Sequence, residues 1–480
     1  MRLLHKAVTP RHWPYLIALF GTGFSTWHLG TPSLWHDEAA TISGANRSLS
    51  SLWGLVQSVD AVHWLYYVLI HFWGQVFGFS DWSVRLPSAI AVGVSAGLLY
   101  FVSKRLGFTD FWAITASLIF LALPRTSLAS IEARSFSIGT AITIGLVLVF
   151  LMALDSNRRK LPWFWFCFLA ALDIYCFLFT GLVLISFALY VVLSKREFVK
   201  PFFISTGIVI FTISPLVMLV SRQQSQISWV QGSDVLHYVY QILLSTPLGV
   251  SGLIDGLAVF AILAAFQRPN LLVVFWATMP GLTLAVYSLF VHPVFVDRYL
   301  SFTTPAMAIL FTYGFMQLKT ITGALKPIWF RLVAIVSGSA LVMLTGTAFS
   351  ASREVNAKGT EWSSIANTLA VELSSGDSVL WPDITTDSAK MLDVISIAYL
   401  DRLKKLNDLT LASTPEESKT LYGLRKPQVE TQLPDSDRVA VVTDVEGVRA
   451  TPIPRWLESN YIAVRTIQFT TATLQIYTRR

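Results

Sequence analysis

The sequence predicts a mainly α-helical protein: a polytopic transmembrane helix bundle of about eleven spans, followed by a small external α/β domain. Three observations predict this class. Hydrophobic residues make up 54% of the 480 residues and charged residues only 14%, whereas soluble globular proteins carry about 25% charged residues. The mean hydropathy is +0.57. Long apolar runs recur through residues 1–350, and residues 351–480 alternate short helix and strand patterns. We therefore expect two domains with these bounds.

The spans follow from length, because a helix needs about 20 apolar residues to cross the hydrocarbon core. Some candidates are short, and residues 162–193 could also form one long tilted helix, so the count is accurate to about one span. The candidates are residues 13–30, 85–102, 111–123, 135–153, 162–175, 179–193, 201–220, 250–266, 271–290, 300–317 and 332–350.

The distribution of charge predicts the topology. Residues 1–350 hold 21 Lys and Arg against 12 Asp and Glu, while residues 351–480 hold 15 against 17. If the N-terminus is cytoplasmic, the cytoplasmic loops carry 15 of the 21 basic residues and the outer loops carry six, as the positive-inside rule requires. An odd number of spans then places residues 351–480 outside the cytoplasm. The basic excess sets membrane topology and does not indicate nucleic-acid binding.

The first outer loop, residues 31–84, contains two predicted helices. They cover residues 38–57 and 62–78, and the second is apolar but rich in aromatic residues. We expect it to lie in the membrane interface. In the tail we expect a strand near 377–382 and a helix at 387–405.

The rest of the tail is rich in β-branched residues. The run at 438–445 predicts a strand, and residues 461–479 predict two strands with a turn near Thr470 and Thr471. No catalytic constellation is visible in the tail. Cys167 and Cys176 both lie in an apolar run, so no disulfide framework is expected.

Two adjacent carboxylates, Asp37 and Glu38, follow the first span in the run Trp35-His36-Asp37-Glu38. Mutual repulsion at a membrane surface should raise the pKa of at least one of them, which suits a general base. Alternatively, Asp37 is the N-cap of the helix at 38–57 and Glu38 favours its positive end.

Further polar side chains predict a substrate pocket. Asp60 and His63, together with Tyr66, could form a polar rim on which a sugar stacks. Asp60 could equally be an ordinary helix cap beside an aromatic belt. Gln226 and Trp229 could hydrogen-bond and stack on a sugar, although such residues are common in any exposed loop.

Three arginines lie singly at the outer membrane edge: Arg85, Arg134 and Arg298. Charges at this depth are costly and tend to be functional, and a guanidinium group binds phosphate well. Arg85 could instead anchor a helix end by snorkelling. Arg134 could form a structural ion pair with Glu132, and Arg298 precedes Tyr299.

Other catalytic signatures are missing. The sequence contains no P-loop, no GxGxxG after a strand and no HExxH, and its GxSxG at residues 93–97 lies inside an expected apolar span rather than at a strand-to-helix turn. ATP-driven transport, nicotinamide chemistry, zincin proteolysis and an α/β-hydrolase site therefore have no support.

Five motifs in order resemble the GT-C membrane glycosyltransferases, in the family 39 branch that contains protein O-mannosyltransferases and aminoarabinose transferases. The resemblance covers residues 13–350. The motifs are W-x-D-E-A at 35–39, D-x-x-H with two tyrosines at 60–67, F-G-x-S-x-W-S-x-R-L-P-S at 77–88, E-A-R-x-F at 132–136 and R-Y at 298–299.

The resemblance implies an enzyme that moves a sugar from a polyprenyl monophosphate donor to an envelope glycan or lipid-linked acceptor, with inversion at the anomeric carbon. The sugar could be mannose or a pentose. Asp37, with Glu38, would supply the catalytic carboxylates, and the three arginines would bind the donor phosphate. Asp60, His63, Tyr66, Glu132, Gln226, Trp229 and Tyr299 would line the pocket. No cofactor is required, although Asp37, Glu38 and Asp60 could coordinate a divalent cation if the fold brings them together.

The chain departs from the family pattern at two positions. Trp64 replaces the first of two prolines after the histidine and the second proline is missing, and Phe177 stands where many relatives carry a histidine. Two other readings remain open: a lipid or sugar transporter, for which internal repeats are expected but not seen, and a non-catalytic envelope scaffold. The catalytic reading requires Asp37 and the three arginines to converge on one cavity at the outer membrane edge.

Overall fold

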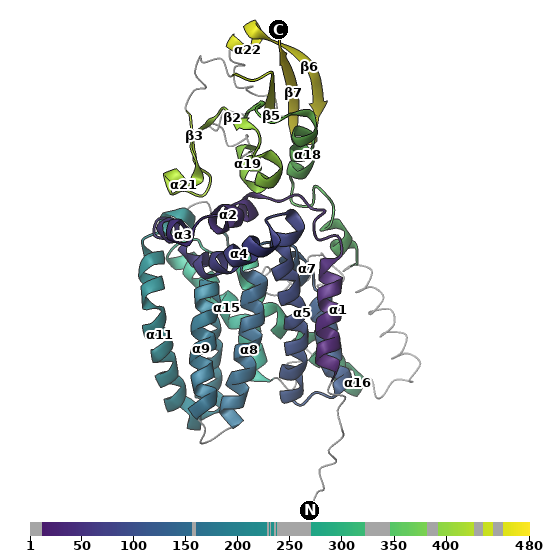
Figure 1. Ribbon diagram of the computed structural model, residues 1–480. Helices are drawn as coiled ribbons and strands as arrows, with labels where there is room; N and C mark the ends of the chain where they lie inside the picture. Colours follow the sequence, from purple (N-terminus) through teal and green to yellow (C-terminus); the bar gives the residue numbers. More distant parts are fainter. Residues whose placement is uncertain are drawn as a thin grey trace, which may run out of the picture. The chain divides into compact units, whose positions relative to one another are not determined.

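The computed structural model describes most of the chain (Figure 1). Its internal contacts divide the protein into two compact units. We call the first the helical unit; it comprises residues 1–27, 61–66 and 85–351. We call the second the α/β unit; it comprises residues 28–60, 67–84 and 352–480. The described residues are 12–155, 160–227, 230, 232–234, 237, 270–321, 346–381, 392–426, 435–444 and 455–480.

The helical unit consists of apolar helices and short 3₁₀ turns. The main helices are α1 (Trp13–Thr26), α5 (Asp81–Arg105), α6 (Asp110–Ala122), α7 (Pro124–Ser130), α8 (Phe136–Asp155), α9 (Lys160–Cys176), α10 (Val183–Ser194), α11 (Val199–Ser221), α15 (Leu271–Phe290) and α16 (Thr304–Ile321). The 3₁₀ segments are η1 (Ala61–His63), η2 (Leu178–Leu182), η3 (Arg196–Phe198), η4 (Gln224–Ile227) and η6 (Asp297–Thr303).

Within the described residues, four helices are long and apolar enough to cross a membrane: α5, α8, α15 and η3 with α11. The pair α6 and α7, bent by 65°, makes a fifth if it counts as one span. The other apolar helices in the described part of the chain are shorter. The expected count of eleven is therefore not confirmed. The expected span at 250–266 and most of that at 332–350 lie outside the described residues.

The alternative of one long helix over residues 162–193 is wrong. Helix α9 ends at Cys176, and Phe177 has extended backbone angles of φ −154° and ψ 108°. A 3₁₀ turn and α10 follow. The break places Phe177 at the end of α9, where its ring packs in the cluster described below.

Aromatic rings fill the centre of the helical unit. Helix α9 packs between α8 and α11, and these helices run side by side in Figure 1. Phe150 of α8 stacks on Phe187 of α10, with ring centroids 4.3 Å apart and planes 14° from parallel. Lipid tails are as apolar as these helices, so the hydrophobic effect does not drive the helices together in a membrane. Close packing of side chains such as these rings stabilises their association instead.

Small residues allow α1 and α5 to approach closely. A Cβ atom at Gly93 would lie 2.1 Å from Thr22 Oγ1, and one at Gly97 would lie 2.7 Å from the carbonyl oxygen of Pro14. Gly93 and Gly97 form a G-x-x-x-G sequence, which is a known helix-packing pattern in membranes. The sequence reading had not identified this contact.

Residues 31–84, expected from the sequence to be the first outer loop, contain three helices: α2 (His36–Ala45), α3 (Leu49–Val56) and α4 (Trp64–Phe77). The single helix expected at 38–57 is thus two helices, because Ser48 caps α3 by accepting from the Ser51 N–H. The suggested cap role of Asp37 is also wrong. The N-cap of α2 is Trp35, so Asp37 lies in the first helical turn.

The α/β unit contains a five-stranded sheet with strand order β2-β1-β5-β7-β6. Strand β1 is parallel to both of its neighbours, and β7 is antiparallel to both of its own. A two-stranded ribbon of β3 and β4 accompanies the sheet. The strands are β1 (Ser378–Leu380), β2 (Asn407–Asp408), β3 (Leu411–Ser413), β4 (Leu424–Arg425), β5 (Arg438–Asp444), β6 (Tyr461–Gln468) and β7 (Ala472–Arg479).

The β-branched runs of the tail form strands where the sequence predicts them, and the turn between β6 and β7 includes Thr470 and Thr471. The expected helix at 387–405 is described only from residue 392. There it consists of three short pieces, η9 (Leu392–Val394), α19 (Ile395–Ala398) and α20 (Leu400–Leu403). Helices α18 (Trp362–Glu372), α21 (Pro415–Ser418) and α22 (Arg455–Asn460) complete the unit.

Part of the first outer loop folds with the tail. The N–H of Leu34 donates to the Tyr399 hydroxyl at 2.7 Å, and the Arg47 guanidinium donates to the carbonyl oxygen of Pro415 at 2.6 Å. Helix α2 packs against α19. The tail is therefore not a separate module within this unit.

We expect Gly93→Ala to lower the free energy of unfolding by about 1–3 kcal/mol, because the added methyl group overpacks the contact with Thr22. Thermal unfolding of the detergent-solubilised protein measures this. Gly23→Ala on α1 is the control, because a Cβ there meets no described heavy atom within 4 Å. Equal melting temperatures for the two variants would contradict the close α1–α5 packing.

Candidate functional site

The two carboxylates of the acidic motif have different surroundings in the α/β unit. Glu38 has no solvent exposure, and its Oε2 lies 2.8 Å from the Lys358 ammonium, which is 9% exposed. The Asp37 side chain is 19% exposed. A buried carboxylate needs a cation partner, so Glu38 is held by Lys358. Asp37 is the carboxylate with access to solvent.

Residues from the tail hold the motif in place. The Tyr422 hydroxyl donates to the carbonyl oxygen of His36 at 3.2 Å and lies 3.1 Å from its Nδ1 atom. The Lys358 ammonium also lies over the Trp35 ring, 5.7 Å from its centroid. Neither Lys358 nor Tyr422 was predicted as a site residue, because nothing in the tail sequence marks them as partners of α2.

Asp60 lies in a strained turn of the same unit. Its φ of 58° is in the left-handed region, and its Oδ2 accepts a hydrogen bond from the Tyr67 hydroxyl. The Tyr67 ring is fully buried and packs over Gly44, where a Cβ would come within 2.9 Å. Among the described residues, no group of three or more His, Cys, Asp or Glu side chains is placed to hold a metal ion.

His63 lies in an aromatic cluster of the helical unit. Its Nδ1 atom is 2.9 Å from the Ser135 hydroxyl, and its ring stacks on Phe177 with centroids 5.6 Å apart and planes 4° from parallel. Phe177 also contacts Phe136 and Tyr299 edge-on. The structure thus brings together His63, the turn after Arg134 and the residue after Arg298.

Side-chain hydrogen bonds connect segments around the three arginines. The Ser88 hydroxyl donates to the carbonyl oxygen of Glu132 at 2.6 Å, which links the α5 turn after Arg85 to the turn before Arg134. On α7, the guanidinium of Arg125 donates to the carbonyl oxygen of Leu300 at 3.3 Å. Leu300 belongs to η6, the segment that carries Arg298.

Two of the three arginines are buried. Arg85 has no exposure and Arg134 is 7% exposed, while Arg298 is half-buried. A buried guanidinium group is stable only where partners compensate its charge.

Two of the remaining predicted pocket residues, Tyr66 and Gln226, are characterised by their burial, which does not by itself indicate a role in substrate binding. Tyr66 is fully buried, and Gln226 is half-buried in η4. The neighbouring Gln223 accepts a hydrogen bond from the Ala61 N–H at 3.0 Å, which anchors η1 and therefore His63. Trp229 lies outside the described residues.

Sequence reasoning missed Asp173 of α9. It is 1% exposed, and its Oδ2 accepts from the Thr143 hydroxyl at 2.6 Å. Asp173 is the only charged residue in 162–193, which is a signal that could have found it. It lies one helical turn before Phe177, whose N–H bonds to its carbonyl oxygen at 2.8 Å, so it belongs to the support of the aromatic cluster.

Residues 64–219 match the family model described as dolichyl-phosphate-mannose-protein mannosyltransferase. No curated protein sequence matches the chain at a significant level. The fold is similar to that of ArnT from Cupriavidus metallidurans, solved bound to undecaprenyl phosphate (TM-score 0.53, 12% identity, 98% of each chain covered) and in the apo state (TM-score 0.55, 12% identity, 97% of each chain).

The fold also resembles the oligosaccharyltransferase AglB from Archaeoglobus fulgidus, in complex with an inhibitory peptide and a dolichol-phosphate. The TM-score is 0.50 at 10% identity, with 97% of this chain and 74% of that chain covered. At such low identity the likeness shows a shared fold. Together with the family match, it confirms the predicted resemblance to the GT-C membrane glycosyltransferases.

We expect Phe177→Ala to destabilise the helical unit by about 3–5 kcal/mol, because it removes the ring on which His63 and Tyr299 pack. In a Cys167→Ser background, heating in the presence of a thiol-reactive fluorophore should label the buried Cys176 at a lower temperature. Phe211→Ala is the control, because that ring is 82% exposed and should cost about 0.5 kcal/mol. Identical labelling curves would show that the cluster is not needed for stability.

Proposed function

Because the chain has the fold of the GT-C membrane glycosyltransferases, we propose that it transfers a sugar from a polyprenyl monophosphate donor to an envelope glycan or lipid-linked acceptor on the outer membrane face. The observation that carries this proposal is the pair of buried arginines, Arg85 and Arg134, on segments of the helical unit that the Ser88–Glu132 hydrogen bond joins. A phosphate in an apolar environment needs such a site. The lipid phosphates bound by the structurally similar proteins support the same donor class.

Asp37 would act as the general base. Its carboxylate retains solvent access, whereas the charge of Glu38 is matched by Lys358. Glu38 therefore supports the motif and Asp37 takes the proton from the acceptor hydroxyl. The hydroxyl oxygen then attacks the anomeric carbon from the face opposite the phosphate, which breaks the carbon–oxygen bond to the phosphate and inverts the anomeric centre.

Arg85, Arg134 and Arg298 would bind the phosphate of the donor. Negative charge on the phosphate grows as the bond to the sugar breaks, so cationic donors stabilise the transition state more than the ground state. His63 and Tyr299 would form the adjoining wall of the sugar pocket. No cofactor is needed in this scheme, and the sugar is mannose or a pentose.

We expect Asp37→Asn to lower kcat for sugar transfer by about 10²–10⁴-fold, with a smaller change in the acceptor KM. Transfer from a polyprenyl-phosphate sugar by the purified protein in lipid nanodiscs measures this. Asp401→Asn is the control, because Asp401 is an exposed carboxylate on α20 of the same unit.

The outcomes of this comparison separate the enzyme from a scaffold. A scaffold would keep the envelope glycan at its normal level in cells that express Asp37→Asn at normal protein level. An enzyme would lose the glycan under the same conditions. Full transfer activity in the Asp37→Asn variant would remove the assignment of Asp37 as the base.

The proposed orientation places the N-terminus in the cytoplasm and the tail outside. In a cysteine-free background, we expect a membrane-impermeant maleimide to label Ser459→Cys in right-side-out vesicles. It should label Ser194→Cys only after permeabilisation. Both side chains are exposed, so both should react once accessible. The reverse pattern would place the acidic motif on the cytoplasmic side and contradict an outer-face reaction.

A further inference from the structure

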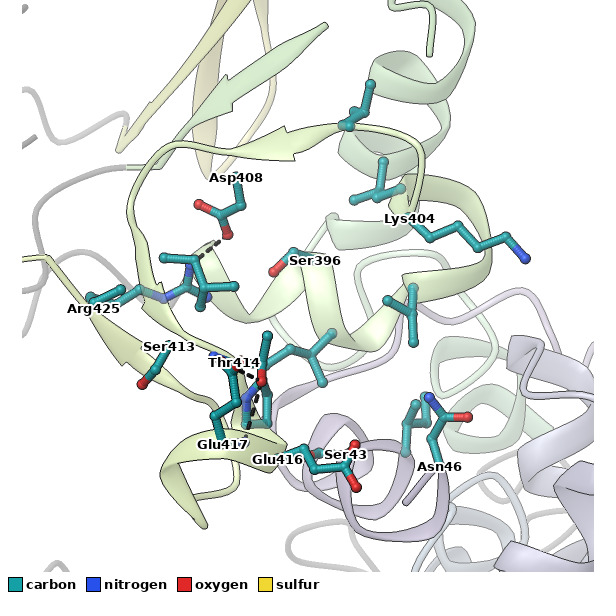
Figure 2. A pocket seen from close by; sticks show the side chains of 18 of the residues that line it. Ser43, Asn46, Ser396, Lys404, Asp408, Ser413, Thr414, Glu416, Glu417 and Arg425 are labelled. Carbon is teal, nitrogen blue, oxygen red and sulfur yellow. Dashed lines mark hydrogen bonds and ion pairs between the residues drawn. The ribbon is translucent and has the colours of Figure 1, made fainter. Parts of the chain in front are cut away.

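A large pocket lined by polar and aliphatic side chains lies entirely within the α/β unit (Figure 2). Its volume is about 650 Å³, within the range of roughly 300–1,000 Å³ that is typical of small-molecule sites. The C-terminal half of α2 forms one wall, with Ser43 and Asn46. Ser396 of α19 forms another, and β3, α21 and Arg425 of β4 complete it. We call it the α2–α21 pocket.

The charges on the walls balance. Three cationic side chains and three carboxylates line the pocket, and most of them already have partners. Arg425 is paired with Asp393 and Asp408, and Glu417 accepts from Thr414 in a capping box. The lining charges are Arg47, Lys404, Arg425, Asp408, Glu416 and Glu417.

Arg47 illustrates why the pocket does not suit an anion. Burial lowers the pKa of its guanidinium group, and the charge of Glu416 partly offsets this. Its Nε atom donates to the carbonyl oxygen of Ser43 at 3.1 Å, and Nη2 donates to the carbonyls of Pro415 and Thr420. A phosphate would need converging cations without a carboxylate beside them.

Several polar atoms in these walls have no hydrogen-bond partner among the described residues. They are Arg47 Nη1, Ser43 Oγ and Ser413 Oγ, and Arg47 is only 4% exposed. A buried polar group without a partner costs about 1–3 kcal/mol. Such groups are commonly satisfied by a ligand or by ordered water. One donor nitrogen and two hydroxyls match the hydroxyl groups of a carbohydrate, which both donate and accept.

Aliphatic side chains lie between these polar groups. Ile42, Ile397 and Leu400 are among the lining residues. They can contact the C–H faces of sugar rings. An acyl chain would instead have to cover the charged groups, which is unfavourable. The mixture of polar and aliphatic side chains therefore favours a neutral carbohydrate over both an anion and a lipid tail.

The pocket lies close to the proposed base along one helix. Asp37 precedes Ser43 by six residues on α2, which is about 9 Å at 1.5 Å per residue. At 100° per residue, the α2 residues of the pocket face the other side of the helix from Asp37, so a glycan has to curve around the helix to reach it. An oligosaccharide of several units is long enough for that path. A glycan held in the pocket could therefore present a hydroxyl group to Asp37.

We propose that the α2–α21 pocket binds a neutral carbohydrate portion of the acceptor and thereby selects the acceptor. This inference rests on the proposed glycosyltransferase function. It adds a substrate class, because it assigns acceptor recognition to residues shared by the first outer loop and the tail. The reacting hydroxyl lies outside the pocket, at Asp37.

The test is direct binding to the full-length protein in nanodiscs. The probes are fluorescently tagged oligosaccharides released from the cell envelope and separated into neutral and anionic fractions. We expect saturable binding of the neutral fraction. Ala412→Trp on β3 should raise its Kd at least 10-fold, because Ala412 is exposed and lines the pocket. Asn46→Ala, which removes an exposed lining amide, should raise it several-fold.

Ala463→Trp is the matched control, because Ala463 is an exposed alanine on β6 outside the pocket. It should leave the Kd unchanged. Binding of neither fraction, preference for the anionic fraction, or equal effects of the two tryptophan variants would overturn the proposal. If Ala412→Trp does not fold, the Kd of Asn46→Ala for the neutral fraction decides the test: an unchanged Kd would overturn the proposal.

The same variants separate this inference from the proposed function. In the transfer assay, Ala412→Trp should raise the acceptor KM much more than it lowers kcat, whereas Asp37→Asn should bind the neutral fraction normally and fail in transfer. If transfer occurs but the acceptor KM of Ala412→Trp is normal, the pocket assignment is wrong and the function stands. If the neutral fraction binds but the native protein transfers no sugar, the function is wrong and the pocket stands.

Discussion

The pairing of buried Glu38 with Lys358 is the interaction on which the α/β unit depends. A carboxylate with no exposure is tolerated only with a cation at hydrogen-bond distance, and this cation comes from a residue 320 positions later in the chain. The pair fixes the first turn of α2 against the tail. The two adjacent acids of the motif differ in exposure: Glu38 is fully buried beside Lys358, whereas the Asp37 side chain is 19% exposed and its Oδ1 lies 3.6 Å from His36 Nδ1.

In the helical unit, polar side chains such as His63 lie within an apolar helix bundle. A break after helix α9 makes room for them. Because α9 ends at Cys176, the ring of Phe177 can stack on His63. Tyr299 packs edge-on against the same Phe177 ring. The Ser88 hydroxyl donates to the carbonyl oxygen of Glu132, and a hydrogen bond joins Ser135 to His63. The arginines therefore sit on segments whose positions are set by side-chain packing.

The sequence predicts the helices and strands well where periodicity and length carry the signal. The bounds expected for α8, α11 and α15 differ from the observed ones by at most two residues, and the β-branched runs of the tail are strands. It cannot predict the division of 38–57 into α2 and α3, which depends on one serine cap. It also cannot predict Lys358 and Tyr422 as partners of the acidic motif, since contacts across more than 300 residues leave no local pattern. Asp37, His63 and the arginines stand out in the sequence because charged and polar residues are sparse among the apolar runs; their roles stay predictions.

The α/β unit is built from two distant parts of the chain, one within residues 28–84 and the other the tail. This limits which segments of the protein can be exchanged with those of another protein. The boundary of an exchangeable segment does not fall at residue 351, because α2 depends on residues from both sides of it. A chimera that takes only the tail from another protein would leave Glu38 without its ammonium partner and Arg47 without its carbonyl acceptors. The first outer loop and the tail must therefore be inherited together, and changes in one should be accompanied by compensating changes in the other.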